Sequence, residues 1–306
     1  MFDCNESLPA ARERNIRDAL REDVGTGDWT ARLIPEHVQA QAQLRVRESA
    51  VLCGRDWFAG CVHALDPTAR ITWHANEGAS LRADTIVCDI EANARALLTA
   101  ERSAMNFLQL LSATATHTRH YVNAIAHASP NPKGCLVLDT RKTIPGLRQA
   151  QKYAVTVGGG ANQRLALWDG ILIKENHIVA AGSISAALHA ARTLDANVTI
   201  QIEVETLDEL QQALSAGADS ILIDNFSEEE MRQAVAINAG RALIEASGGI
   251  TLDSVRRVAE TGVDRISIGA LTKDIKAVDY SLRVTARNGE SMVGRATGQG
   301  SGKSRL

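Results

Sequence analysis

The chain has 306 residues, 45% of them hydrophobic, which is enough for roughly two domains or for one barrel with an addition. With 33 Lys and Arg against 36 Asp and Glu, its formal net charge of -3 argues against a general nucleic-acid or membrane-surface binder. Five scattered Cys without a CxxC pair, no signal-like start and no apolar run of about 18 residues favour a soluble protein of the reduced cytoplasm.

The N-terminal part predicts a small α+β domain. A helix is expected to begin at Ser7, because Pro9 follows and apolar residues then recur on one face until Gly25. The acids of residues 22–30 are interpreted as turn formers, with contact to a cation as the alternative. Short segments with β character follow at residues 42–47, 51–53, 70–74 and 86–88.

Residues 91–112 predict a long helix, because apolar side chains recur there at helical spacing. Arg102, Asn106 and Gln109 share its polar side. The spacing alone favours an ordinary solvated face for Arg102.

From residue 136 onward the pattern becomes a regular repeat of strand and helix. Thr206 with Glu209, and Ser227 with Glu230, fit capping boxes, and Thr251 is expected to cap a third helix. Glycines are placed to end these helices. The glycines are Gly217, Gly240 and Gly262, and the strands are expected at 136–138, 171–173, 198–204, 221–223, 242–244 and 266–268.

Polar residues or glycines follow each expected strand, which favours a barrel over an open doubly wound sheet. All carboxyl strand ends of a barrel surround one opening, whereas an open sheet has its crevice mainly at the switch point. These residues are Asp139, Arg141, Lys142, Lys174, Glu175, Glu203, Asp224, Asn225, Glu245, Ser247, Gly248, Gly249 and Gly269.

Within residues 139–177, four cations lie beside expected strand ends: Arg141, Lys142, Arg164 and Lys174. Like charges repel when they are gathered, so a fold that converges them is expected to bind an anion. Separate solvated surface charges are the alternative. His177 could act as a general acid or base, but a structural role is favoured.

Glycines and carboxylates at the later strand ends suggest phosphate and a metal. Ser247, Gly248 and Gly249 precede an expected helix, so backbone N–H groups there could face phosphate, and Gly269 follows the next strand. Glu203 and Asp224 could hold Mg²⁺ or ribose hydroxyls, the alternative being ion pairs with Lys142 or Lys174. Positioning and electrostatics are indicated rather than a covalent nucleophile.

Residues 289–306 are rich in Gly and Ser, lack apolar periodicity and predict a disordered tail. The GQGSGKS segment is a poor match to a phosphate loop, because the spacing fails and no helix can follow it.

At these residues the sequence resembles the quinolinate phosphoribosyltransferase family. The resemblance runs through EDVGTGDWT, ERSAMNFLQLLSATAT, DTRKTIPGLR, KYAVTVGGGANQRLAL, ILIKENHI, IEVET, ILIDNF, EASGGI and ISIGALT. It implies an N-terminal α/β sandwich (1–112), an incomplete α/β barrel (113–272) and a segment returning to the first domain (273–288). It also implies that quinolinate and 5-phosphoribosyl-1-pyrophosphate give nicotinate mononucleotide, CO₂ and pyrophosphate, with Mg²⁺ required.

The resemblance also implies roles for individual residues. Arg141, Arg164 and Lys174 match ligands of the quinolinate carboxylates. Arg102 matches an arginine that reaches the site from the other subunit of a dimer, which reverses the interpretation from spacing. A higher oligomer is the alternative to a simple dimer. Residues near phosphoribosyl pyrophosphate and its metal are matched by Lys142, Glu203 and Asp224, and its phosphate loops by Ser247, Gly248, Gly249 and Gly269.

Gln163 departs from the family, which usually has His at this place. Gln can donate a hydrogen bond but cannot become cationic, so retained activity with altered affinity is expected. The competing interpretations are a related phosphoribosyltransferase-like protein of molybdenum-transport operons and a non-catalytic phosphosugar-binding protein on the same scaffold. The presence of Lys142, Glu203 and Asp224 favours the enzyme.

Overall fold

The computed structural model describes residues 6–287 and 290–291, and the chain forms two compact units. The first contains the residues up to 112 together with those from 277, and the second contains residues 113–276. Within the described residues, no helix is both long and apolar enough to cross a membrane. The predicted disordered tail, including GQGSGKS, lies almost wholly outside the described residues.

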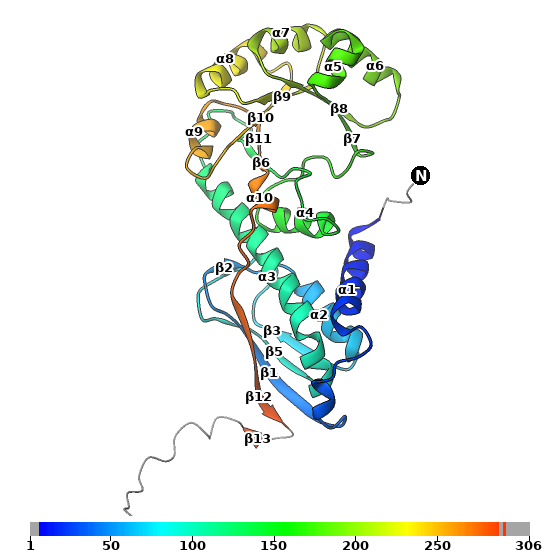
Figure 1. The fold of residues 1–306 in the computed structure, drawn as a ribbon. Coiled ribbons are helices and arrows are strands. Elements are labelled where there is room, and N and C mark those ends of the chain that lie inside the picture. Colours follow the sequence, from blue (N-terminus) through cyan, green and yellow to red (C-terminus); the bar gives the residue numbers. More distant parts are fainter. Residues whose placement is uncertain (1–5, 288–289, 292–306) are drawn as a thin grey trace, which may run out of the picture. The chain divides into compact units, whose positions relative to one another are not determined.

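The first unit is an antiparallel sheet with helices. Its five-stranded sheet has the order β13-β12-β1-β5-β3, and β2 pairs with β4 in a separate two-stranded antiparallel sheet (Figure 1). Leu44 and Val46 of β1 are fully buried and share one face, and Trp57 and Phe58 of α2 are buried in the same unit. The elements are α1 (Leu8–Val24), η1 (Ala31–Leu33), β1 (Gln39–Val46), β2 (Ala50–Val51), α2 (Arg55–Leu65), β3 (Arg70–Trp73), β4 (Ser80–Leu81), β5 (Ile86–Asn93), the first part of α3 (Ala94–Ala124), β12 (Tyr280–Arg287) and β13 (Glu290–Ser291).

The second unit is an incomplete barrel. Six parallel strands follow the order β6-β11-β10-β9-β8-β7, and among the described residues β6 and β7 do not pair, so the sheet curls without closing. Figure 1 shows helices α5 to α8 on the outer side of these strands. The elements are β6 (Leu136–Leu138), α4 (Arg148–Val157), β7 (Gly170–Ile173), α5 (Glu175–Ala181), α6 (Ile184–Thr193), β8 (Thr199–Val204), α7 (Leu207–Ser215), β9 (Ser220–Asp224), α8 (Glu228–Asn238), β10 (Leu243–Ser247), α9 (Val255–Glu260), β11 (Arg265–Ser267) and α10 (Ala270–Lys273).

The strands of this sheet have an apolar face and a polar face. In β8, Ile202 and Val204 belong to the apolar core together with Leu188 of α6 and Leu210 of α7. Alternate residues of a strand point to opposite faces, so the residues between them point to the other side of the sheet. Because the apolar face packs against the helices, the alternate residues of each strand point to the inner side of the barrel.

Most of the expected elements are confirmed, with three differences. The helix predicted at residues 91–112 begins at Ala94, because β5 continues to Asn93, and it extends to Ala124. Helix α2 was not predicted. The predicted Thr251 cap was wrong: Thr251 lies in a turn with Ser254, whose Oγ accepts from the Thr251 backbone N–H, and α9 begins only at Val255.

The other predicted helix ends agree with the structure. Ser7 caps α1 through the N–H of Ala10, and Ser227 and Glu230 form the complete capping box. Thr206 caps α7, although Glu209 accepts from the N–H of Glu205 rather than from that of Thr206. Gly217, Gly240 and Gly262 follow their helices with φ of 75°, 76° and 93°. Asp28 accepts from the N–H of Ala31, which confirms its role as a turn former.

Ser227, which caps a helix, and Thr251, which does not, give a stability test. We expect Ser227→Ala to lower the free energy of unfolding by about 1 kcal/mol, because it removes the cap of α8. Thr251→Ala is the control and should change it by less than about 0.5 kcal/mol. Urea denaturation followed by circular dichroism measures both, and equal losses would contradict the assignment of the caps.

Candidate active site

Polar side chains gather on the inner face at the carboxyl ends of β8, β9 and β10. Glu203 pairs in register with Leu222, and Asp224 with Ser247. Paired residues of parallel strands share a face, and so do residues two apart. Glu203, Asp224 and Ser247 therefore lie on one face, and so do Gln201 and Glu245, one alternation deeper.

Arg141 and Arg164 form a cationic pair beside this face. The pKa of Arg164 is lowered by burial and then by the positive charge of Arg141, so the two guanidinium groups influence each other. Arg164 donates to the carbonyl of Gly170 at 2.8 Å. The Nε of Arg141 is buried and has no hydrogen-bond partner among the described residues. A buried unpartnered donor next to a second cation indicates a place for an anion.

Lys174 is paired with Glu203. Its Nζ lies 2.5 Å from Oε2 of Glu203, whose side chain is 10% exposed. This is the ion pair that the sequence left open as the alternative to a metal or ribose contact. His177 accepts the backbone N–H of Lys174 through Nδ1 at 3.0 Å and completes the cap of α5, as the structural interpretation predicts.

Lys142 lies over Gly269. A Cβ built on Gly269 would stand 3.0 Å from Cδ of Lys142, so a side chain there would displace the lysine. The backbone near Lys142 is fixed, because its N–H donates to the Thr140 hydroxyl and its carbonyl accepts from the Thr272 hydroxyl. The structure thus places an exposed ammonium beside the loop after β11.

Ser247, Gly248 and Gly249 form an open turn after β10. Gly248 has φ +103° and passes so close to Asn225 that an added Cβ would lie 2.1 Å from its Oδ1, so only glycine fits. Gly249 has φ +58° and nothing within 4 Å of its Cβ position. The helix expected directly after this turn begins only at Val255, so its N-terminus does not follow the glycines at once.

The carboxylates of Glu203 and Asp224 are the pair that the sequence predicts for a metal or ribose contact. Asp224 accepts from the amide of Asn225 at 2.8 Å, and Glu203 is engaged by Lys174. Within the part of the chain that the structure describes, no group of three or more His, Cys, Asp or Glu could hold a metal ion. Hard oxygen donors suit Mg²⁺, which keeps several waters and takes substrate phosphate, so two carboxylates fit a metal that arrives with a phosphorylated substrate.

Gln163 is held through both its main chain and its side chain. Asp139 is 0% exposed and accepts from the Gln163 N–H at 3.0 Å, while Lys152, 2% exposed, donates to the Gln163 carbonyl at 2.8 Å and forms an ion pair with Asp139. Burial raises the pKa of Asp139 to about 6, although the adjacent Lys152 lowers it. The side-chain amide of Gln163 donates to Gln201 at 2.8 Å.

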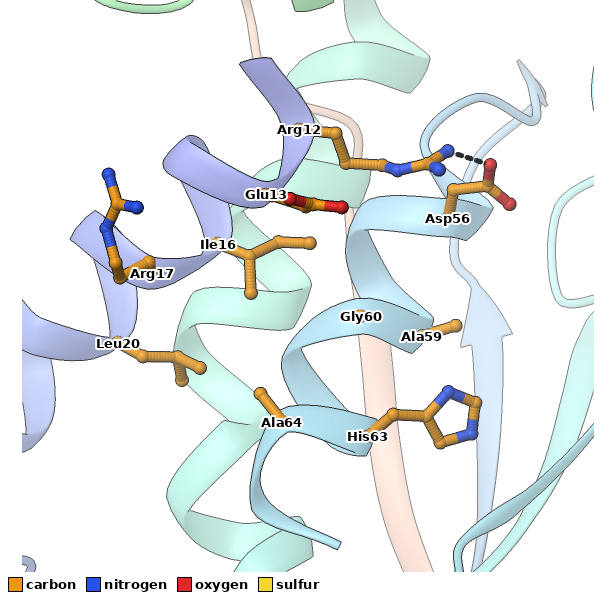
Figure 2. A pocket seen from close by; sticks show the side chains of 10 residues that line it. All are labelled: Arg12, Glu13, Ile16, Arg17, Leu20, Asp56, Ala59, Gly60, His63 and Ala64. Carbon is orange, nitrogen blue, oxygen red and sulfur yellow. Dashed lines mark hydrogen bonds and ion pairs between the residues drawn. The ribbon is translucent and has the colours of Figure 1, made fainter. Parts of the chain in front are cut away.

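Arg102 belongs to the first unit, where it is exposed on α3. That unit also has a groove of about 760 Å³ between α1 and α2, lined by Ile16, Leu20, Ala59 and Gly60 (Figure 2). Its rim includes the ion pair of Arg12 and Asp56. No predicted site residue lines this groove.

Both halves of the chain match one family. Residues 28–112 match the N-terminal domain of quinolinate phosphoribosyl transferase, and residues 114–283 match its C-terminal domain. The chain belongs to the quinolinate phosphoribosyltransferase family. The two matches together cover both compact units.

Individual members of the family are similar over most of their length. The nicotinate-nucleotide pyrophosphorylase (carboxylating) of Mycobacterium leprae is 37% identical over 290 residues, which cover 92% of this chain and 99% of that protein. A quinolinate phosphoribosyltransferase (decarboxylating) of Nicotiana tabacum is 33% identical over 287 residues, with coverage of 87% and 80%. The solved nicotinate-nucleotide pyrophosphorylase of Francisella tularensis is 44% identical, with a TM-score of 0.86 and coverage of 93% and 100%.

Sequence reasoning missed the buried polar residues beneath the quinolinate phosphoribosyltransferase site. Lys152 and Gln201 received no role, and Asp139 and Glu245 were expected at the mouth but are buried below it. Gln201 and Glu245 lie two residues before Glu203 and Ser247. That spacing of two within apolar strands could have revealed that a polar line continues below the mouth.

The ion pair of Asp139 and Lys152 gives a second stability test. We expect Lys152→Met to lower the free energy of unfolding by about 3–5 kcal/mol, because it leaves the Asp139 carboxylate buried without its partner. Lys133→Met is the matched control on an exposed lysine and should cost less than about 0.5 kcal/mol. Equal stability of the two variants in urea denaturation would refute this role of the pair.

Proposed function

We propose that this protein transfers the phosphoribosyl group of 5-phosphoribosyl-1-pyrophosphate to quinolinate, giving nicotinate mononucleotide, CO₂ and pyrophosphate for NAD biosynthesis. The observation that carries this proposal is the match of both units to one family. The cationic pair with a buried unpartnered donor supports it, because quinolinate carries two carboxylates. Reducing conditions suit the buried free thiols of Cys53, Cys61 and Cys88, in keeping with the cytoplasm.

Quinolinate would bind against Arg141, Arg164 and Lys174. A guanidinium can hold a carboxylate through two parallel N–H groups, and the free Nε of Arg141 is suited to one of them. The pKa of Arg164 is lowered by burial and then by the positive charge of Arg141, and a dianion would offset that repulsion. Binding would also draw Lys174 toward a carboxylate and away from Glu203.

Phosphoribosyl pyrophosphate would bind at the open turn of Ser247, Gly248 and Gly249 and beneath Lys142. Positive-φ glycines expose backbone N–H groups that suit phosphate oxygens. The ammonium group of Lys142, next to Gly269, would stabilise the negative charge of the pyrophosphate as it leaves. Bound Mg²⁺ would neutralise charge on the departing pyrophosphate, and Glu203 and Asp224 are the residues that would help to hold it.

Glu203 and Asp224 would also act on the ribose. Both lie on the inner face at the mouth, where a carboxylate favours the positive charge that develops at the anomeric carbon as pyrophosphate leaves. The pyridine nitrogen then forms the new bond to that carbon. The positive ring nitrogen stabilises the electron pair left on the adjacent ring carbon when its carboxylate departs as CO₂, and that carbon then takes a proton from water, so decarboxylation needs no further cofactor.

Arg102 would complete the quinolinate site of a partner subunit in a homodimer. The residue is exposed, and no hydrogen bond or ion pair fixes it among the described residues. An arginine kept at an exposed helix position can serve a neighbouring subunit because its long side chain reaches outward.

The activity is tested directly by mixing quinolinate, phosphoribosyl pyrophosphate and Mg²⁺ with the protein and measuring nicotinate mononucleotide. The same assay with nicotinate in place of quinolinate tests the substrate. Product from nicotinate but none from quinolinate would overturn the proposal, and binding of both substrates without any product would favour a non-catalytic protein.

Arg141→Ala should lower kcat/KM for quinolinate by more than about a hundredfold, because it removes a charged contact to a carboxylate and leaves the substrate charge unpaired. Its KM for phosphoribosyl pyrophosphate should change much less. Arg232→Ala, on the exposed side of α8, is the control and should retain normal kinetics. An Arg141→Ala enzyme with the parent kcat/KM would remove this residue from the site.

Subunit mixing tests Arg102. Coexpression of differently tagged Arg102→Ala and Arg141→Ala chains allows purification of the mixed dimer. If Arg102 acts across the interface, one site of that dimer has both arginines, and about half of the parent activity should return. If Arg102 acts within its own subunit, both sites are defective and the mixed dimer stays inactive like either homodimer.

A further inference from the structure

The side chain of Gln163 begins a directional chain of hydrogen bonds that ends at a buried carboxylate. Gln163 Nε2 donates to Gln201 Oε1 at 2.8 Å, and Gln201 Nε2 donates to Glu245 Oε2 at 2.9 Å. Gln201 is 6% exposed and Glu245 is 1% exposed. The chain therefore runs from the mouth of the barrel into its interior.

Glu245 sets the direction of this chain. Its Oε2 accepts from Nε2 of Gln201, and in its charged form a carboxylate can only accept hydrogen bonds, so this contact requires the NH₂ end of Gln201. The second acceptor of that NH₂ group is the Ser220 hydroxyl at 3.2 Å, which can either donate or accept and imposes no direction. With its nitrogen committed to Glu245, Gln201 can offer only its oxygen to Gln163, so Gln163 must turn its own nitrogen inward.

The main chain of Gln163 is held at both its N–H and its carbonyl group. Its N–H is held by Asp139 and its carbonyl by Lys152, and both partners are buried. At the end of its side chain, the amide can take two orientations that have nearly the same shape and opposite hydrogen-bonding character. Held by Gln201, the amide keeps its second N–H and its carbonyl oxygen in a fixed order.

From this geometry we infer that Gln201 and Glu245 are positioning residues that fix which end of the Gln163 amide meets the pyridine dicarboxylate. The inference rests on the proposed function, since it concerns the quinolinate site. An amide that can rotate freely would have to be ordered when the substrate binds, and the entropy lost in ordering it weakens binding. Gln201 and Glu245 act only through Gln163 and do not touch substrate.

The test variant is Glu245→Gln, which keeps the size of the side chain and removes the acceptor-only group. The new amide can accept or donate, so the direction of the chain is no longer imposed. We expect KM for quinolinate to rise by about three- to tenfold, equivalent to one hydrogen bond, with kcat and KM for phosphoribosyl pyrophosphate within about twofold of the parent enzyme. Ser220→Ala is the matched control and should leave all three constants within about twofold, because Ser220 imposes no direction.

A double-mutant cycle separates positioning from a general structural effect. In a Gln163→Leu background the amide is absent, so Glu245→Gln should cause no further rise in KM for quinolinate. The same rise in both backgrounds, or no rise in the single variant, would overturn the inference. A partly misfolded variant would lower kcat. It would not raise KM for quinolinate alone. If the parent protein makes no nicotinate mononucleotide from quinolinate, the proposed function fails instead.

Discussion

Asp139 is fully buried beyond the end of β6, and the structure of the mouth depends on how its carboxylate is held. Lys152 of α4 supplies the opposite charge, and both residues bind the main chain of Gln163. One ion pair thus joins the loop that carries Arg141 to the turn that carries Arg164. Burying two charges is costly unless each is paired and hydrogen-bonded, and the peptide of Gln163 supplies those additional bonds.

This buried pair explains how mutually repelling cations can be held together without bound substrate. Burial and then the positive charge of Arg141 lower the pKa of Arg164. A flexible loop would let the two arginines separate, but Asp139 and Lys152 hold the turn after α4 through the main chain of Gln163. An anion can offset the repulsion between the two guanidinium groups. Because the residues beneath the site hold these groups in place, the site is already arranged for binding.

The two faces of each barrel strand have different roles: the outward face stabilises the fold, and the inward face carries polar residues. The outward residues of β8, β9 and β10 form an apolar core with the surrounding helices, while the inward residues form a polar line from Glu245 and Gln201 up to Ser247 and Glu203. Shifting a strand by one residue would exchange these faces. The register that secures the core therefore also places the carboxylates, and neither could be changed alone.

The sequence by itself determined the repeat of strands and helices, most helix ends and the residues at the mouth, because periodicity, caps and glycines act over a few neighbouring residues. Tertiary structure decided the pairing of Lys174 with Glu203, the burial of Lys152 against Asp139 and the chain from Gln163 to Glu245. Those contacts join residues 13 to 44 positions apart, and their partners follow from strand order and curvature rather than from local pattern. Thr251 shows the same limit: it has the residue type of a cap, but the path of the chain delays the helix until Val255.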